Sequence, residues 1–307
     1  MGAKIIGTGS ALPDHVITNS HFADYLDTSD EWIVSRTGIK ERRFGGTTAS
    51  LAVEAGREAI SAANLLPGDI DFVVLATTTP DQTVPASTAE ISYQLGTSGG
   101  AMDLNAACAG YVYALVTARA LIGMGMNRIL VIGSDTLSRI TDQNDRSTAV
   151  LFADGAGAVV LERSDEDAFL GWDLGIDGSA RPILYCDHGG YMYMEGQEVF
   201  KRAVRVMIDS AERALKQAGV SGDQIKLLVP HQANLRIIQA ANDRLGIPID
   251  RTAIVLDQTG NTSSASIPLA LDDAVRNRRL SKGDLVLFTG FGAGMTWASA
   301  VVRWEDL

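Results

Sequence analysis

Cys108 is the residue of this chain whose type and surroundings point most directly to chemistry. It stands in the run Asn105-Ala106-Ala107-Cys108-Ala109-Gly110-Tyr111, where small residues open a long apolar segment of helical character. A thiol in the first turn of a helix feels the positive end of the macrodipole, which favours the nucleophilic thiolate. The small neighbours leave room for a substrate and for a backbone N–H that faces a reacting carbonyl. The alternative is a buried, inert structural cysteine.

His231 and Asn261 are the polar residues that could assist such a nucleophile. His231 directly follows a strongly apolar predicted strand that ends in Val229-Pro230, and imidazole titrates in the range useful for catalysis. Asn261 lies in the segment Gly260-Asn261-Thr262-Ser263-Ser264-Ala265. Taken alone, the histidine also suits a hydrogen-bonded structural role, and the asparagine suits a turn or a helix cap.

Two glycine-rich segments follow predicted strands. Gly290-Phe291-Gly292-Ala293-Gly294 lacks the spacing of a nucleotide-binding fingerprint. It predicts instead a backbone loop that closes an oxyanion site, because glycines let N–H groups point inward. Gly7-Thr8-Gly9-Ser10 predicts only a turn after the first strand.

The elements that must position these residues occur twice in the chain. A helix end, a buried strand and a second strand recur at a spacing of 155 to 156 residues. In the first copy these three elements are 58–65, 72–77 and 129–133, and in the second copy they are 213–220, 227–231 and 285–290. Position 108 then corresponds to position 264, so the Asn261 loop takes in the second copy the place of the Cys108 loop in the first. A pseudo-twofold axis between the copies would bring both loops and His231 to one cleft.

Each copy alternates helices with short, continuously apolar strands, a pattern typical of α/β units whose strands are buried on both faces. We therefore expect an α/β fold of two pseudo-twofold-related halves, 1–165 and 166–307, whose sheets stack with helices between and outside them. Ligands of open α/β sheets bind beyond the carboxyl ends of the strands, which is where His231 and the glycine cluster lie.

Composition excludes several classes of function. The 307 residues are 46% hydrophobic and carry a formal net charge of −11, which argues against nucleic-acid binding. Two cysteines give neither a disulfide framework nor a metal-site spacing, so we expect no metal and a reducing compartment. No apolar run reaches transmembrane length, and the apolar stretch at the N-terminus is too short for a signal peptide. We expect a soluble, cytoplasmic protein that does not bind membranes.

Several motifs together resemble the β-ketoacyl-acyl-carrier-protein synthase III family, which has the thiolase fold. The resemblance runs nearly end to end and rests on these segments: Asp30-Glu31-Trp32-Ile33-Val34-Ser35-Arg36-Thr37-Gly38-Ile39, Ala106-Ala107-Cys108-Ala109-Gly110, Asp154-Gly155-Ala156-Gly157-Ala158, His231-Gln232-Ala233-Asn234-Leu235-Arg236-Ile237-Ile238, Gly260-Asn261-Thr262-Ser263 and Phe291-Gly292-Ala293-Gly294. It implies a five-layered α-β-α-β-α architecture.

The resemblance also implies an activity and the residues that perform it. Cys108 would attack an acyl-coenzyme A thioester and carry the acyl group, with the backbone N–H groups of Cys108 and Ala293 as the oxyanion hole. Malonyl-acyl carrier protein would then enter, and His231 with Asn261 would stabilise the enolate-like charge as carbon dioxide leaves. The product is a 3-ketoacyl chain two carbons longer, the first step of fatty acid synthesis. No cofactor is implied, since coenzyme A arrives as the substrate thioester.

Further positions match the family's substrate contacts. Trp32 and Arg146 resemble the pair that clasps the adenine of coenzyme A, and Arg36 resembles a basic group that meets its phosphates. The basic residues that would meet the acidic carrier protein are Lys201, Arg236 and Arg244. Val84 matches a position that reaches into the partner's acyl pocket in the family's homodimer, where a small residue would admit a branched or longer acyl group.

The chain departs from the family pattern at two loops and one helix. The loop after Arg43 and the segment from Asp173 to Tyr193 are shorter than expected, and Asp243 stands where a basic residue could meet the carrier. These changes suit a trimmed entrance, and they also suit a same-fold acyltransferase or condensing enzyme of secondary metabolism with another acceptor. A non-catalytic partner subunit is a third alternative, but it would be expected to lose the nucleophile.

Overall fold

Two β-sheets of matching topology form the frame of the molecule. A computed structural model describes residues 2–305. The first sheet has the order β1-β7-β6-β4-β5, in which β4 runs parallel to β5 and β6, and β7 runs antiparallel to β6 and β1. Its strands are β1 (Gly2–Ala11), β4 (Phe72–Ala76), β5 (Gly100–Leu104), β6 (Arg128–Thr136) and β7 (Asp154–Ser164).

The second sheet repeats this arrangement with the order β8-β13-β12-β11, in which β12 runs parallel to β11 and β13 runs antiparallel to both of its neighbours. Its strands are β8 (Phe169–Ile176), β11 (Leu227–Pro230), β12 (Leu285–Gly292) and β13 (Thr296–Arg303). An isolated parallel bridge between Leu228 and Thr252 lies beyond β11, where the first sheet has β5. The matching order confirms the two related halves predicted from the repeat.

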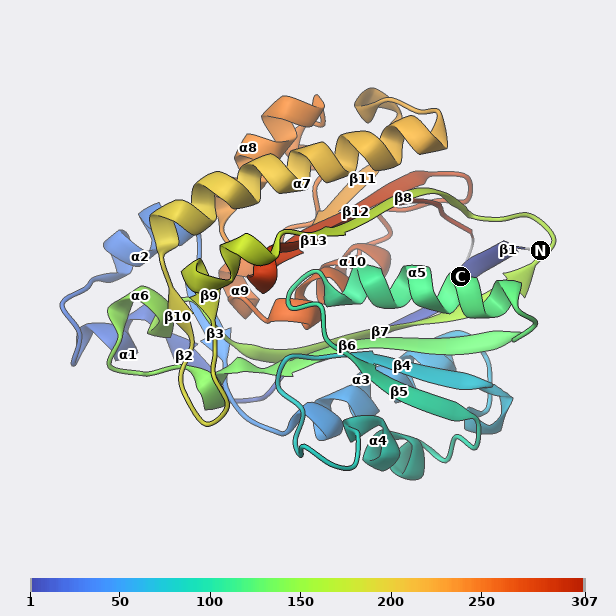
Figure 1. Cartoon of the computed structure of the whole chain (residues 1–307), viewed down its shortest axis with the longest axis horizontal. Helices are drawn as coiled ribbons and strands as arrows, with labels where there is room; N and C mark the ends of the chain where they lie inside the picture. Colours follow the sequence, from blue (N-terminus) through green and yellow to red (C-terminus); the bar gives the residue numbers. More distant parts are fainter. Residues whose placement is uncertain (1, 306–307) are drawn as a thin grey trace.

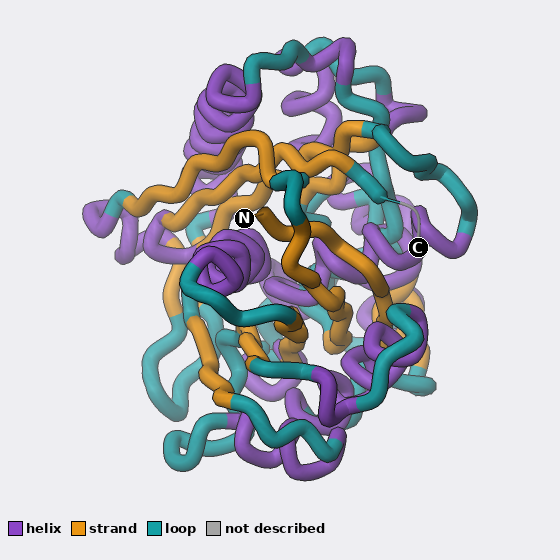
Figure 2. Tube along the Cα trace, turned by 90° about the vertical axis from the view of Figure 1, so that its right-hand side faces the viewer, coloured by secondary structure: helices purple, strands orange, loops and turns teal. Residues whose placement is uncertain are grey.

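Helices form three layers around the two sheets (Figures 1 and 2). One pair packs on the outer face of the first sheet, a second pair lies between the sheets, and a third covers the outer face of the second sheet. In that order they are α3 (Thr48–Ala62) and α4 (Ser87–Leu95), α5 (Gly110–Gly123) and α10 (Ser266–Arg276), and α7 (Gly196–Ala218) and α8 (Leu235–Leu245). This is the predicted five-layered thiolase-like fold.

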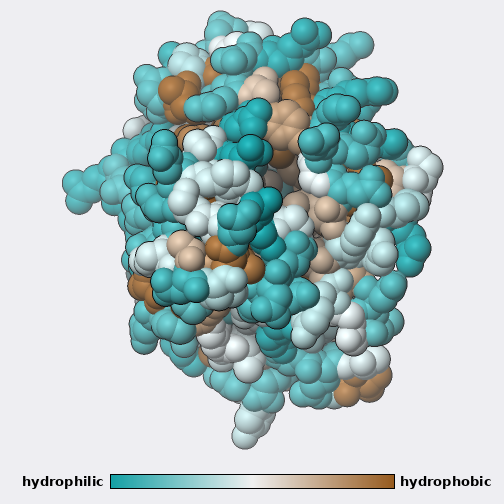
Figure 3. Space-filling model, turned by 90° about the vertical axis from the view of Figure 1, so that its left-hand side faces the viewer, coloured by the Kyte–Doolittle hydropathy of each residue, from teal (hydrophilic) through white to brown (hydrophobic). Residues whose placement is uncertain are grey.

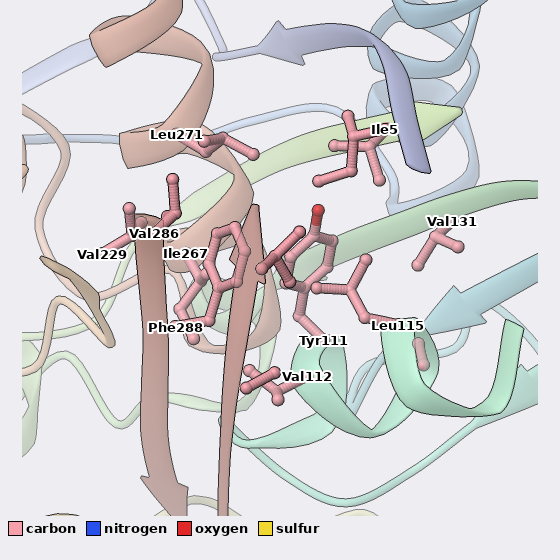
Figure 4. Packing of buried hydrophobic residues seen from close by; sticks show 14 of the residues in the cluster. Ile5, Tyr111, Val112, Leu115, Val131, Val229, Ile267, Leu271, Val286 and Phe288 are labelled. Carbon is pink, nitrogen blue, oxygen red and sulfur yellow. The ribbon is translucent and has the colours of Figure 1, made fainter. Parts of the chain in front are cut away.

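The central layer explains why α5 is apolar almost all round. A helix between two sheets must bury opposite faces; Val112 and Ala114 of α5, which lie about 160° apart around the helix axis, are fully buried, and so are Tyr111 and Leu115. Figure 4 shows them between Ile5 and Val131 of the first sheet and Phe288 of the second. The outer helix α7 is amphipathic instead, because only one of its faces meets a sheet.

One sequence prediction about the first strand is wrong. Residues 7–10 do not form a turn but lie inside β1. Glycine is needed there because α3 crosses the strand closely: a Cβ on Gly7 would lie 2.4 Å from the carbonyl oxygen of Ala59, and a Cβ on Gly9 would lie 2.4 Å from that of Ala55. The two glycines therefore serve helix-on-sheet packing.

Short elements gather at one end of the sheets, on the left of Figure 1. They are β2 (Val16–Thr18), α1 (Asn19–Ala23), α2 (Asp30–Thr37), β3 (Glu41–Arg43), α6 (Arg146–Ala149), β9 (Leu184–Tyr185), β10 (Tyr193–Met194) and α9 (Leu256–Thr259). The trimmed segment predicted between Asp173 and Tyr193 folds as the end of β8, a 3-10 turn and the β9–β10 hairpin. Among residues 2–305, no helix combines the length and apolarity needed to cross a membrane.

Candidate active site

Cys108 lies in the turn that connects β5 to α5. It comes two residues before Gly110, the first residue of α5, rather than inside the first turn of that helix. Ala107 has φ of 50°, a left-handed conformation that costs a non-glycine residue about 1 kcal/mol or more. The Asn105 side chain supports this turn, because its Oδ1 accepts a hydrogen bond of 3.1 Å from the Ala107 N–H.

The same turn occurs in the second half, 156 residues later, around Asn261. Ser263 also has φ of 50°, and Asn261 Oδ1 accepts a hydrogen bond of 2.9 Å from the Ser263 N–H. Asn261 is tied to the segment that precedes β7, since its N–H donates to the Leu151 carbonyl and its carbonyl accepts from the Ala153 N–H. With Oδ1 engaged in the turn, the Nδ2 amide is the group that Asn261 can offer to a ligand.

His231 directly follows β11, and its ring is fixed from α10. Nδ1 lies 2.7 Å from Ser266 Oγ, which also accepts a hydrogen bond of 3.3 Å from the Gln232 N–H. The serine hydroxyl can donate its proton to Nδ1, and in that tautomer Nε2 carries the imidazole proton. Burial lowers the pKa of His231 to about 3, so the ring is neutral at physiological pH.

The protonation state of Cys108 differs from the sequence prediction. The pKa of the thiol is raised to about 12, mainly by burial and to a smaller extent by the charge of Asp135, while the nearby Ser263 hydroxyl acts in the opposite direction. Cys108 lies just before the N-terminus of α5, where the macrodipole favours negative charge, but burial has the larger effect on this thiol. Desolvation therefore outweighs the dipole, and the resting side chain is a thiol rather than a thiolate.

The glycine cluster after β12 approaches the backbone of Cys108. A Cβ on Gly292 would lie 2.5 Å from the Cys108 nitrogen and 2.7 Å from the Ala107 Cβ, so only glycine fits there. Ala293 follows and lines the same cavity as Cys108. The two predicted oxyanion-hole residues, Cys108 and Ala293, thus lie on backbone segments in contact.

One cavity unites Cys108, His231, Asn261 and Ala293. Its other walls are mainly apolar. The β9–β10 hairpin contributes Leu184, Met192 and Met194, and α7 contributes Val199 and Phe200. The remaining apolar residues are Leu137, Leu151, Phe152, Ile237 and Phe291. Figure 3 shows the face on the left of Figure 1, which is hollowed near its centre, with apolar residues in the hollow and hydrophilic ones around it. An apolar pocket with a few convergent polar groups is the usual form of a small-molecule site.

The predicted coenzyme A contacts form a stack outside the cavity wall. The guanidinium groups of Arg36 and Arg146 each lie 4.8 Å from the centre of the Trp32 ring. The Arg36 carbonyl accepts a hydrogen bond of 2.9 Å from Asn234 Nδ2, and Asn234 lines the cavity. The stack is therefore linked by a hydrogen bond to a residue of the cavity wall.

The remaining predicted contacts lie on the surface. Lys201 on α7 and Arg236 and Arg244 on α8 are exposed, and the Arg236 guanidinium lies 5.4 Å from the ring centre of Phe200, a cavity residue. Arg244 is eight residues further along α8, roughly 12 Å from Arg236 along the helix axis. Val84 is 81% exposed and does not line the cavity of its own chain.

Asp135 is a buried residue behind the cavity wall that the sequence motifs did not indicate. Its Oδ1 accepts hydrogen bonds of 2.7 to 3.1 Å from the 77–79 loop, and its Oδ2 accepts from the N–H (3.0 Å) and the hydroxyl (2.6 Å) of Ser264. Ser264 corresponds to Cys108 in the repeat. Asp135 lies near the end of β6, so the strand-end criterion that found His231 could have found it too.

Among residues 2–305, no group of three or more His, Cys, Asp or Glu side chains is arranged to hold a metal ion. The chemistry that these residues can offer is that of a neutral thiol beside two neutral hydrogen-bond donors.

Comparison with known proteins agrees with this geometry. Residues 102–178 match the family model 3-oxoacyl-[acyl-carrier-protein (ACP)] synthase III, and residues 215–304 match the model of its C terminal part. A β-ketoacyl-[acyl-carrier-protein] synthase III of Erythrobacter litoralis is 47% identical over 98% of this chain and 99% of its own length. The crystal structure of 3-oxoacyl-[acyl-carrier-protein] synthase III from Aquifex aeolicus is 44% identical, with a TM-score of 0.97 over 99% of this chain and 100% of that one.

The priming β-ketosynthase of the R1128 polyketide biosynthetic pathway is also similar, at 36% identity and a TM-score of 0.95 over 99% of this chain and 97% of its own. This chain thus shares its fold with enzymes of more than one pathway. The sequence matches span nearly its whole length. The chain therefore belongs to the β-ketoacyl-[acyl-carrier-protein] synthase III family, and it is an acyltransferase of the thiolase fold.

Proposed function

We propose that the cavity catalyses the decarboxylative condensation of an acyl-coenzyme A with malonyl-acyl carrier protein, giving 3-ketoacyl-acyl carrier protein, coenzyme A and carbon dioxide. One observation carries this proposal: the Cys108 thiol, the His231 ring and the Asn261 amide line one otherwise apolar cavity. The pair of neutral donors suits a reaction in which negative charge develops on a thioester oxygen.

Acyl transfer to Cys108 is the first half-reaction. The sulfur attacks the thioester carbon of the acyl-coenzyme A, and the backbone N–H groups of Cys108 and Ala293 stabilise the oxyanion. The bond to the coenzyme A sulfur then breaks. The thiol proton leaves with that sulfur, so the step yields an acyl-cysteine and free coenzyme A without net charge in the cavity.

Decarboxylation and carbon–carbon bond formation make up the second half-reaction. The malonyl thioester oxygen accepts hydrogen bonds from His231 Nε2 and Asn261 Nδ2 as the bond to the carboxylate breaks and carbon dioxide leaves. The resulting enolate carbon attacks the acyl-cysteine carbonyl and expels the Cys108 thiolate, which takes up a proton from the solvent. His231 remains neutral and acts as a donor rather than as a base, in keeping with its low pKa of about 3.

The surface groups supply the contacts that the two substrates require. The Trp32 ring with Arg36 and Arg146 suits the adenine and phosphates of coenzyme A, since guanidinium groups stack on aromatic planes and pair with phosphate. Lys201, Arg236 and Arg244 would form the local basic patch that an acidic carrier protein needs on a chain with a net charge of −11.

Mass spectrometry after incubation with acyl-coenzyme A donors of different chain lengths tests the proposal. Wild type and Cys186→Ala should gain one acyl group each, whereas Cys108→Ala should gain none. Addition of malonyl-acyl carrier protein should then release carbon dioxide and remove the acyl group from Cys108. The absence of an adduct on wild type would overturn the mechanism, and an adduct that survives malonyl-acyl carrier protein would favour a different acceptor.

The quaternary structure and location form part of the same proposal. We infer a homodimer, which the free edge strand β5 and the exposed Val84 and Tyr93 support as a contact surface. Light scattering on the purified protein should report twice the mass of the chain. A cytoplasmic location is supported by two unpaired cysteines, Cys108 and Cys186.

A further inference from the structure

The Ser263 hydroxyl is a buried polar group that makes no hydrogen bond within the turn around Asn261. Ser263 is 1% exposed, and its Oγ has no hydrogen-bond partner of normal geometry in the described part of the chain. A buried hydroxyl without a partner is destabilising. Ser263 also lines the cavity beside Cys108 and Asn261, so a partner could arise there during the reaction.

The local backbone does not explain the serine. Ala107 holds the equivalent position of the first half with the same φ of 50°, so this turn forms without a hydroxyl. The turn at Ser263 is held by other groups: Asn261 Oδ1 accepts its N–H, and Asp135 accepts the N–H of Ser264. The strained residue is thus fixed by its neighbours, and its side chain is left free to face the cavity.

Among residues 2–305, no positively charged group acts on Cys108 to stabilise a thiolate. The titratable groups that face it are Asp135, whose charge opposes ionisation, and His231, which is neutral. The Ser263 side chain is close enough to lower the pKa of the thiol against the effect of burial, although the contact is too loose to count as a formed hydrogen bond at rest. Catalytic hydrogen bonds are often long before the reaction begins and tighten as charge develops.

We propose that Ser263 is a further catalytic residue, whose hydroxyl donates a hydrogen bond to Cys108 Sγ while that sulfur carries negative charge. This occurs as the thiol loses its proton during acyl transfer and again when the condensation expels the thiolate. The serine keeps its own proton throughout. The inference rests on the role of Cys108 as the nucleophile proposed above.

Alkylation of Cys108 by iodoacetamide at pH 8 tests the hydrogen bond without any substrate of the enzyme. In this reaction the thiolate displaces iodide, so at fixed pH the rate follows the thiolate fraction. In a Cys186→Ser background, which leaves a single thiol, Ser263→Ala should slow alkylation about tenfold, the effect of losing one hydrogen bond to a charged group. Ser263→Gly should slow it similarly, and glycine suits a φ of 50°, so this variant covers the case in which Ser263→Ala fails to fold.

Thr262→Val is the matched control. It removes a neighbouring hydroxyl that is equally buried and also lacks a partner but does not line the cavity, and it should leave the rate unchanged. Unchanged alkylation in both Ser263 variants, or an equal loss in Thr262→Val, would overturn the inference. So would slower acyl transfer without slower alkylation, because Ser263 would then act on the substrate. Failure of wild type to form an acyl-cysteine would refute the proposed reaction. The alkylation rates would still show whether Ser263 donates a hydrogen bond to Cys108 Sγ.

Discussion

The neutral state of His231 has a measurable consequence for stability. Its pKa in the folded protein is about 3, against an ordinary value of 6.5, because burial disfavours the charged ring. Between these pH values the unfolded chain binds a proton that the folded chain does not, so stability falls as the pH drops below 6.5. From pH 7 to pH 5 this single group should lower the free energy of unfolding by about 2 kcal/mol, and the figure hardly depends on the folded pKa as long as that lies below about 4.

Urea denaturation of wild type and His231→Asn at several pH values between 5 and 7.5 measures this effect. Asparagine can keep an acceptor near the position of Nδ1 for the Ser266 hydroxyl, but it does not titrate. All other titratable groups are common to the two proteins, so the difference between their pH profiles isolates the ring. The variant should lose about 2 kcal/mol less than wild type on going to pH 5. Parallel profiles would show that the ring is not held neutral and would refute the donor role argued for it.

Three further substitutions separate the parts of the site. Gly292→Ala should reduce acyl-cysteine formation on Cys108 by about a hundredfold or more in single-turnover measurements, because the added Cβ would lie 2.5 Å from the Cys108 nitrogen. Ser266→Ala should slow carbon dioxide release about fivefold to tenfold, because His231 would lose one neutral hydrogen bond, and it should leave the rate of acyl transfer unchanged. An equal decrease in the rates of both steps would contradict the tautomer assigned to His231. Asp135→Asn should lower the free energy of unfolding by about 2 to 4 kcal/mol in urea, since an amide group would face the Ser264 N–H, and a loss below about 0.5 kcal/mol would mean that the network is not stabilising.

The repeat was the part of the sequence that predicted most of the fold. Strands and helices at a constant spacing specify two similar halves, and the four strands of the second sheet have the order and pairing directions of β1, β7, β6 and β4 in the first. The spacing also placed the Asn261 loop opposite the Cys108 loop, where the structure has two turns of identical φ. Local pattern alone failed at residues 7–10, because nothing near those glycines in the sequence reveals that α3 crosses them.

The electrostatics of the site could not be predicted in the same way. The sequence shows a thiol before a helix, but the pKa of Cys108 depends on burial by elements from both halves. Asp135 likewise accepts hydrogen bonds from Thr77, which is 58 positions away from it in the sequence, and from Ser264, which is 129 positions away. Desolvation and long-range hydrogen bonds are properties of the packed molecule, so the sequence supplied the identities of the reacting groups and not their charge.

The two related turns show how a duplicated frame acquires an asymmetric site. Asn105 and Asn261 form the same side-chain hydrogen bond, yet Asn105 is exposed whereas Asn261 is buried in the cavity wall. At the next equivalent pair, Cys108 faces the cavity, whereas Ser264 is held by Asp135. One half thus presents a nucleophile on a turn supported by an exposed asparagine, and the other presents the asparagine on a turn anchored by a carboxylate. The role of each loop therefore depends less on its own residues than on the residues of the opposite half that pack against it. For this reason neither half alone would hold the site.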